Sequence, residues 1–197
     1  QQIYNVIDKG RVMQQAFRGM TLLDYAINAS LVLSYVAMRK EDKAGLVTFD
    51  EHFDTFVPAS RQPGYMQTLL ENLYSQQTTF GETDFSALCV HLNKHVGKRS
   101  LLVLYTNFSS IGSMNRQLSY LKQLNHRHRL LVVFFEDADL KEYIAQPAKD
   151  TEGYYRHVIA EKFAYEKRLI VSTLKQHGIY SLLTTPCLLY TSPSPRD

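Results

Sequence analysis

YNVIDKGRVMQQAFRGMTLLDYAINASLVLSYVAM, residues 4–38, is the stretch around which the rest of the chain can be arranged. The apolar run at residues 3–8 ends at the carboxylate of Asp8 and predicts a strand that is central in its sheet, because it is apolar on both faces. Thr21 and Asp24 have the spacing of a capping box and predict a helix over residues 22–39. This helix is apolar nearly all round, which predicts that it is buried.

The remaining periodic segments alternate between strand and helix patterns. We predict strands at residues 43–49, 53–57, 101–105, 130–135 and 179–183, with the first two joined as a hairpin and Pro58 ending it. We predict helices at residues 65–75, 84–96, 114–124, 140–145 and 154–176. This alternation indicates an α/β fold, a doubly wound and mostly parallel sheet with one antiparallel edge hairpin.

Length and composition narrow the class of protein. The chain has 197 residues and a net charge of +3, which is too small to indicate binding to nucleic acid or to an anionic membrane. The longest apolar block, residues 26–38, is shorter than the roughly 18 residues that a membrane span needs. Residues 1–186 therefore suit one domain of ordinary size.

The two ends of the chain have a different character. The chain begins abruptly at a strand, so we expect it to be a fragment that lacks upstream segments. Residues 187–197, CLLYTSPSPRD, back-translate to a transposon-end sequencing adapter read in frame, and we predict that they are an unstructured artefact. Only Cys89 then remains, which excludes a disulfide framework and makes a reducing compartment the default.

Three predicted strands end in polar side chains at Asp8, Asn107 and Glu136. The loop that ends at Thr83 should meet them at the same rim of the sheet, where a site would be built. Asp8 has a purely structural alternative, because a strand-end carboxylate can accept hydrogen bonds from loop amides. Lys9 and Arg11 are expected to be solvated. A further acidic group, Glu136-Asp137-Asp139, lies at a predicted strand end. We predict that it is either a second anionic element at the rim or part of a solvated loop.

Other conspicuous residues favour structural interpretations. The cluster at residues 126–129, HRHR, predicts a cationic helix end. Cys89 lies on the apolar face of a predicted helix and is expected to be an inert core residue. The chain has 13 tyrosines, and packing is expected to explain most of those in the helices and strands. The tyrosines concerned are Tyr25, Tyr35, Tyr105, Tyr120, Tyr154, Tyr155 and Tyr165.

Five ordered motifs carry a resemblance to a known family. They are VIDKGRVM at residues 6–13, TLLDYAINASL at 21–31, DKAGLVTF at 42–49, GETDFSAL at 81–88 and SLLVLYTNF at 100–108. In this order and spacing they resemble a von Willebrand factor A domain, and more narrowly the bacterial family called domain of unknown function 58. The resemblance covers residues 1–186.

The resemblance implies a metal-ion-dependent adhesion site, in which oxygen ligands hold a divalent cation that binds a partner's carboxylate. Asp8 matches the first Asp of that motif and Thr83 matches its Thr. Gly10 and Val12 stand where two serines are expected, and Asn107 stands where a second Asp is expected. We therefore predict a degenerate metal site of Asp8, Thr83 and Asn107 and expect no cofactor, with Mg²⁺ as the alternative.

The resemblance also implies a function. The expectation is a non-enzymatic protein-interaction module of a larger, membrane-anchored bacterial protein, on the cytoplasmic face of the inner membrane, working with a MoxR-type AAA+ ATPase. The alternative is a divalent-metal-dependent adhesion domain that uses Asp8 and Thr83. A third hypothesis, a hydrolase with Asp8 as nucleophile or base, needs a second acid or a cation at the same rim.

Overall fold

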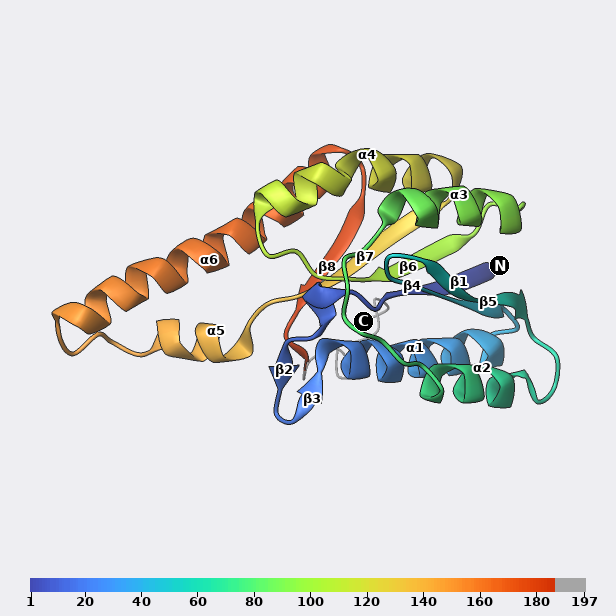
Figure 1. Cartoon of the computed structure of the whole chain (residues 1–197), viewed down its shortest axis with the longest axis horizontal. Coiled ribbons are helices and arrows are strands. Elements are labelled where there is room, and N and C mark those ends of the chain that lie inside the picture. The colour runs from blue at the N-terminus through green and yellow to red at the C-terminus, as the bar shows by residue number, and fades with distance from the viewer. Residues whose placement is uncertain (187–197) are drawn as a thin grey trace.

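The computed structural model describes residues 1–186, which form one six-stranded sheet with helices on both faces (Figure 1). The strand order is β5-β4-β1-β6-β7-β8. The parallel strands are β1 (Gln2–Asp8), β4 (Lys43–Phe49), β6 (Leu101–Tyr105), β7 (Arg129–Phe135) and β8 (Tyr180–Thr184). The antiparallel edge strand is β5 (Phe53–Ser60). The predicted fold class is confirmed, whereas the prediction of an artefactual tail falls on residues outside the described range.

The helices form two layers. One layer consists of α1 (Leu22–Arg39) and α2 (Tyr65–Tyr74), and the other consists of α3 (Phe85–His95), α4 (Ile111–Arg127) and the C-terminal half of α6 (Thr151–Gln176) (Figure 1). Two separate clusters of buried apolar side chains fill the spaces between these layers and the sheet. Within residues 1–186, no helix combines the length and the apolar character that a bilayer span requires.

Strand β1 is the central element, as predicted. Its residues from Ile3 to Asp8 are buried, and it pairs in parallel with β4 on one side and β6 on the other. Asp8 is in register with Phe49, and Ile7 is in register with Tyr105. The residues that directly follow β1, β4 and β6 therefore emerge at the same rim of the sheet.

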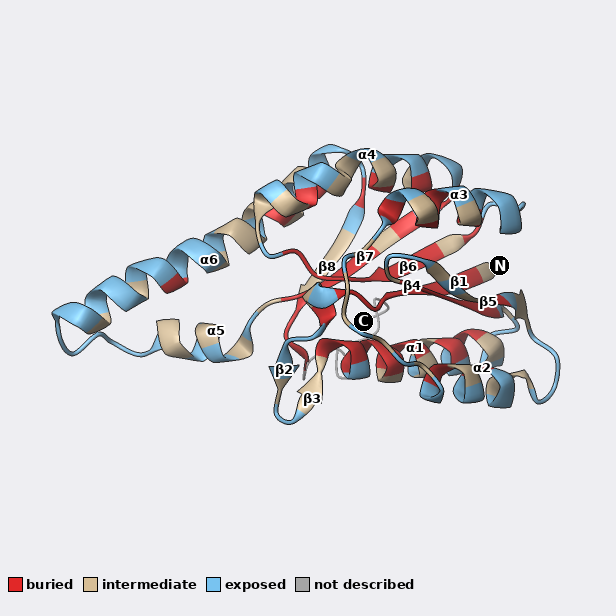
Figure 2. Cartoon of the chain, viewed as in Figure 1, coloured by how far each residue is buried: buried red, intermediate tan, exposed pale blue. Residues whose placement is uncertain are grey.

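Helix α1 begins as predicted but is not buried on all sides. The Thr21 side chain accepts a bond from the Asp24 amide, and the Asp24 carboxylate accepts one from the Thr21 amide, which completes the capping box. The side chains of Val32, Tyr35 and Val36 are 53%, 52% and 41% exposed. Exposed and buried positions alternate along α1 (Figure 2). The prediction of an all-round buried helix is therefore wrong, because α2 covers only one flank of α1.

The connection after β7 forms a helical arm. Helix α5 (Ala138–Ala145) packs against the N-terminal half of α6, and the pair projects away from the sheet (Figure 1). The N-terminal half of α6 is mostly exposed (Figure 2). Its residues Tyr154, Tyr155 and Tyr165 are 58–65% exposed. Packing accounts for Tyr25 and Tyr105, which are buried, but the same prediction is wrong for Tyr35 and for the three tyrosines of the arm.

Two local features differ from expectation. Strand β5 continues through Pro58 to Ser60, because an edge strand needs no amide donor on its free side and a register shift between Ala44 and Leu46 accommodates the irregularity. A short helix η1 (Arg11–Met13) and a small hairpin of β2 (Ala16–Phe17) and β3 (Met20–Thr21) lie between β1 and α1, where the sequence predicts only a loop.

Candidate functional site

Asp8 lies at the carboxyl end of β1 and is fully buried. Its Oδ1 atom accepts hydrogen bonds from the Gly10 amide at 2.7 Å and from the Thr83 hydroxyl at 2.9 Å. Its Oδ2 atom accepts one from the Thr106 hydroxyl at 2.7 Å. Burial raises the pKa of Asp8 to about 6, even though the bonds from Thr106, Gly10 and Thr83 act to lower it.

Thr106 was not among the site residues predicted from the sequence. It directly follows β6, as Asp8 ends β1, and these two strands are paired in parallel. Thr106 could have been predicted as a site residue from its position directly after a strand, because the carboxyl ends of parallel strands meet at one rim of the sheet.

Gly10 is required by the space around it and not by its backbone angles. Its φ of −77° is open to any residue, but a Cβ atom there would lie 1.9 Å from the Thr83 hydroxyl oxygen and 3.2 Å from the backbone oxygen of Gly81. The Arg11 amide donates to that same Gly81 oxygen at 2.8 Å. The loop after β1 is therefore closed tightly onto the loop that carries Thr83, and a serine at position 10 does not fit this arrangement.

Asn107 is nearly buried at the same rim and is held by a side chain from α6. Its Oδ1 atom accepts a hydrogen bond from the Lys167 ammonium at 2.7 Å, and the backbone oxygen of Phe108 accepts another at 2.6 Å. Burial lowers the pKa of Lys167 to about 8, although the carboxylates of Asp137, Glu136 and Glu166 act to raise it. Lys167 lies 60 residues beyond Asn107 in a helix, and no sequence signal links the two.

Lys9 is buried, so the expectation that it is solvated is wrong. Its ammonium donates to the Asp54 carboxylate at 2.6 Å and to the backbone oxygen of Gln77 at 3.0 Å. The hydrogen bond from Lys9 is the largest cause of a lowered pKa at Asp54. Arg11 is exposed, as expected, and pairs with Glu82 at 3.2 Å.

The acidic residues after β7 are engaged elsewhere. Glu136 pairs with Lys141 at 3.0 Å, and the Asp137 carboxylate caps α5 by accepting from the Leu140 amide at 3.1 Å. No hydrogen bond within residues 1–186 joins either carboxylate to Asp8. The second acidic element is therefore a helix cap and a surface ion pair at the base of the α5–α6 arm.

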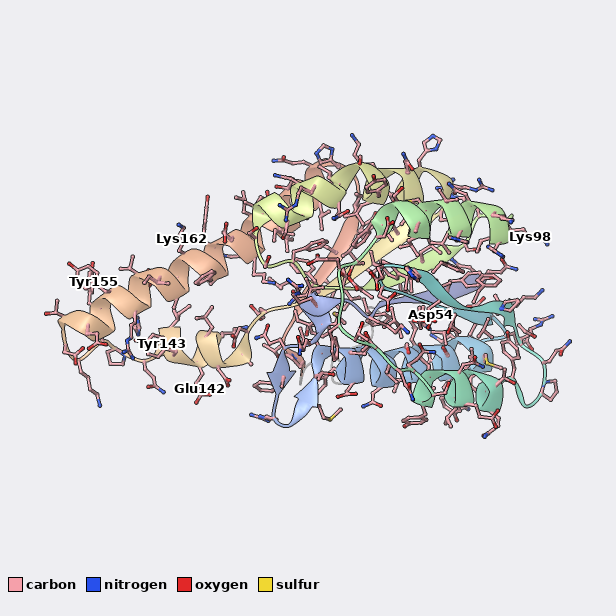
Figure 3. All side chains as sticks on the ribbon, viewed as in Figure 1. Asp54, Lys98, Glu142, Tyr143, Tyr155 and Lys162 are labelled. Carbon is pink, nitrogen blue, oxygen red and sulfur yellow. The ribbon has the colours of Figure 1, made fainter. Side chains whose placement is uncertain are left out.

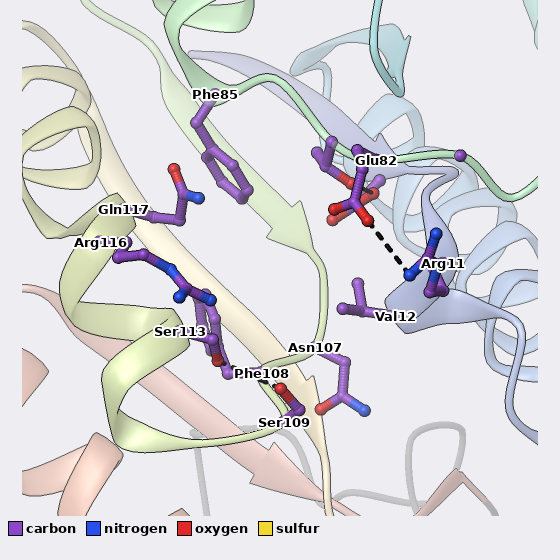
Figure 4. Close-up of a pocket in the computed structure, with 13 residues that line it drawn as sticks. Arg11, Val12, Glu82, Phe85, Asn107, Phe108, Ser109, Ser113, Arg116 and Gln117 are labelled. Carbon is purple, nitrogen blue, oxygen red and sulfur yellow. Dashed lines mark hydrogen bonds and ion pairs between the residues drawn. The ribbon is translucent and has the colours of Figure 1, made fainter.

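The rim residues surround one pocket of about 250 Å³ (Figure 4). Asp8, Thr83 and Asn107 all line it, so the structure brings together the three residues predicted from the sequence. Arg116 and Gln117 approach the pocket from α4, and Arg11 and Val12 face them from the loop after β1 (Figure 4). In the described part of the chain, no group of three or more His, Cys, Asp or Glu side chains is arranged to hold a metal ion.

The family of the chain follows from comparison with known proteins. The model of the family described as "Protein of unknown function DUF58" matches residues 9–143, which is more than half of the chain. The chain belongs to the DUF58 family. No curated protein matches the sequence significantly.

Solved structures similar to this DUF58 chain have the von Willebrand factor A fold, so the resemblance drawn from the sequence is confirmed. The SpRpn10 VWA domain is 9% identical with a TM-score of 0.55, over 99% of this chain and 89% of that one. The PilB minor pilin of Streptococcus sanguinis is 9% identical with a TM-score of 0.59, over 96% and 59%. An aerotolerance-related membrane protein of Bacteroides fragilis is 14% identical with a TM-score of 0.50, over 68% and 66%. The DUF58 chain thus spans two thirds or less of the pilin and of the membrane protein.

Two other candidates in the DUF58 chain have structural roles. His128 caps the end of α4 in a buried position, where its Nδ1 atom accepts from the Ser100 amide at 3.3 Å and its Nε2 atom has no partner within the described residues. Burial lowers the pKa of His128, so the predicted cationic helix end does not include this residue. Cys89 is buried on α3, and burial raises the pKa of its thiol to about 11.

Proposed function

We propose that this chain is a protein-interaction module that docks a partner protein at the carboxyl-end rim of its sheet and performs no chemistry there. The observation that carries the proposal is the state of Asp8. Both of its carboxylate oxygens accept hydrogen bonds from the chain itself, and the residue is fully buried. A nucleophile or general base must reach its substrate, so this geometry disfavours the hydrolase hypothesis.

The docking surface is the rim pocket. Asp8 and Asn107 line it, and their side chains are already hydrogen-bonded, Asp8 to Thr106 and Asn107 to Lys167. Arg116 stands exposed at its edge and makes no ion pair within the described residues, so its guanidinium is free to bind a carboxylate of a partner. The pocket can therefore recognise a partner through a rigid base and a positively charged edge.

The family resemblance is the basis for a more specific proposal about the partner and its setting. We propose that the module belongs to a larger membrane-anchored bacterial protein, lies on the cytoplasmic side of the inner membrane and binds a MoxR-type AAA+ ATPase. The fold shared with the aerotolerance-related membrane protein of Bacteroides fragilis is compatible with such a parent.

Direct binding tests the proposal. A purified MoxR-type ATPase from the same genome is titrated against the chain and against Arg116→Glu, which reverses the charge at the pocket edge. Lys122→Glu, which reverses the charge of another exposed cation on α4, is the matched control. We expect Arg116→Glu to weaken binding by roughly 10-fold or more and Lys122→Glu to leave it unchanged. Equal binding by all three proteins would remove the rim as the docking surface, and no binding by any would remove the ATPase as the partner.

A metal-dependent adhesion domain is the second candidate, because Asp8 and Thr83 lie in contact. The surrounding residues fit a divalent cation poorly. The Thr83 hydroxyl already donates to Asp8, and the side-chain oxygen of Asn107 faces an ammonium group that would repel Mg²⁺. We therefore propose a rim that works without a metal, and a Mg²⁺ titration decides between the two.

A further inference from the structure

The N-terminal half of α6 exposes an unusual amount of apolar surface. Six large apolar side chains there are between 48% and 65% exposed, namely Tyr154, Tyr155, Val158, Ile159, Phe163 and Tyr165. Half-exposed aromatic side chains each leave about 100 Å² uncovered, given that a full one buries 150–250 Å². An apolar patch of a few hundred Å² is about the largest that a typical monomer exposes, and such patches often mark an interaction surface.

Only one side of this half-helix is covered. Helix α5 contacts α6 through Tyr143, whose ring lies 4.8 Å from the His157 ring and whose hydroxyl donates to the Gly153 oxygen. Ala160 is the buried residue in this half of α6, and α5 itself has no buried residue. Tyr155 and Lys162 lie on the side of α6 that faces away from α5 (Figure 3). The arm therefore has an inner face against α5 and an outer face around Tyr155 and Lys162. Tyr154, Val158 and Phe163 lie at the two borders of this outer face, where they line the pockets beside α5.

Five of the six exposed side chains form two adjacent rows. Tyr155, Ile159 and Phe163 follow one another at a spacing of four residues and form a ridge. Tyr154 and Val158 form a second ridge beside it. Ridges at this spacing pack into the grooves of another helix that has the same spacing, which is the commonest mode of helix packing in globular proteins. A second α6 would offer the required ridge and groove.

The charges on α6 indicate what kind of partner fits. Apart from Lys167, which points into the rim, the charged side chains from position 152 to position 168 alternate in sign along the helix. They are Glu152, Arg156, Glu161, Lys162, Glu166 and Arg168. A surface for anionic lipids or nucleic acid would be predominantly basic, whereas alternating charges can pair with a copy of themselves in the opposite direction.

We propose that the outer face of the α5–α6 arm binds the same face of a second copy of this chain, with the two α6 helices packed against each other about a two-fold axis. The six side chains leave on the order of 500 Å² on each copy, so complete burial of both sets would remove roughly 1,000 Å² of apolar surface from water, which is the lower end of the size range of specific interfaces. The rim pocket is built from other side chains and stays accessible in this dimer.

Sedimentation equilibrium of the whole chain over a range of concentrations tests the proposal. We expect a reversible monomer–dimer equilibrium for the wild type. Ile159→Asp places a carboxylate in the middle of the ridge and should raise the dimer dissociation constant by roughly 10–100-fold. Val90→Asp is the matched control, because Val90 is an aliphatic residue on α3 that is 62% exposed and stands apart from the arm. It should leave the equilibrium unchanged.

Two outcomes would overturn the proposal. The first is a wild-type chain that remains monomeric at every concentration. The second is a dimer that Ile159→Asp does not weaken, with Val36→Asp on α1 showing whether the exposed patch of that helix is responsible instead. Circular dichroism and thermal unfolding of each variant exclude misfolding as the cause. Because Ile159 is exposed, its replacement should not disturb the fold.

Discussion

The ammonium group of Lys167 lies 2.7 Å from the side-chain oxygen of Asn107, which joins α6 to the rim of the sheet. A positive charge of the protein itself therefore lies beside Asn107. The relationship has consequences for stability, for metal binding and for the pH dependence of folding.

The pH dependence of stability should contain a contribution from Lys167. Its pKa is about 8 in the folded chain against 10.5 as its ordinary value, so between these values the unfolded chain binds more protons. Stability therefore rises with pH through this window, because the cost of burying the charged ammonium is relieved. Relative to Lys167→Met, the wild type should gain on the order of 2–3 kcal/mol from neutral pH to pH 10.

Urea unfolding of the two proteins across that range provides the measurement. Lys162→Met, on the outer face of the same helix, is the control and should follow the wild-type curve. A constant difference between wild type and Lys167→Met at all pH values would contradict a buried, titrating ammonium.

Asp8 should have the opposite pH signature. Its pKa is about 6 in the folded chain against 3.8 ordinarily, so the folded chain binds the proton more tightly between these values. Its contribution to stability is fully present below about pH 3.8 and is lost as pH rises through about 6. Asp8→Asn should abolish this slope while keeping the fold, because the amide can accept from Gly10 and donate to the Thr106 hydroxyl.

Asp8→Ala is the informative comparison. It leaves the buried Gly10 amide without an acceptor and should cost on the order of 1–3 kcal/mol at neutral pH. Chemical denaturation of both variants measures the difference. If Asp8→Asn were as damaging as Asp8→Ala, the charge of Asp8 would matter more than its hydrogen bonds.

The two partners of the Lys9–Asp54 pair should respond unequally to mutation. Lys9 is 3% exposed at its side chain and Asp54 is 47% exposed. Asp54→Ala leaves a buried ammonium without its counter-ion and should cost on the order of 2–4 kcal/mol. Lys9→Met leaves a carboxylate that water can solvate, and its methionine suits a buried site, so the cost should be smaller.

Thermal unfolding of both variants, with the double variant completing a cycle, checks this asymmetry. Because the pKa of Asp54 is lowered in the folded chain, its carboxylate contributes to stability above its ordinary pKa of 3.8. This contribution is lost as pH falls through the folded pKa. Equal losses for the two single variants would refute the asymmetry.

Restoring the missing serines should not create a metal site in this loop. A side chain at position 10 would meet the Thr83 hydroxyl, so Gly10→Ser should cost on the order of 1–3 kcal/mol and break the bond from Thr83 to Asp8. Gly97→Ser is the control, since a Cβ atom there meets nothing within 4 Å.

Calorimetric titration with Mg²⁺ completes this test. Neither the wild type nor the combination of Gly10→Ser, Val12→Ser and Asn107→Asp should bind the ion or gain melting temperature from it. Binding by the wild type would favour the metal-dependent alternative.

Much of the fold could be predicted because its signals are local. Thr21 and Asp24 are three residues apart, and β4 and β6 were predicted with their observed ends. The exposed face of α1 and the aromatic outer face of α6 were not predicted. An apolar pattern indicates which side chains favour burial, but whether a neighbour covers them depends on where other elements pack.

The sequence by itself determined the strand–helix order, the α/β class and the positions of Asp8, Thr83 and Asn107 at strand and loop ends. Periodicity and capping act over a few residues, so they can be read along the chain. Only the tertiary structure decided that Thr106 binds Asp8 across 98 positions, that Lys9 is buried against Asp54 and that Lys167 holds Asn107. These contacts depend on loop paths and on desolvation of charged groups, which arise only when distant segments pack together.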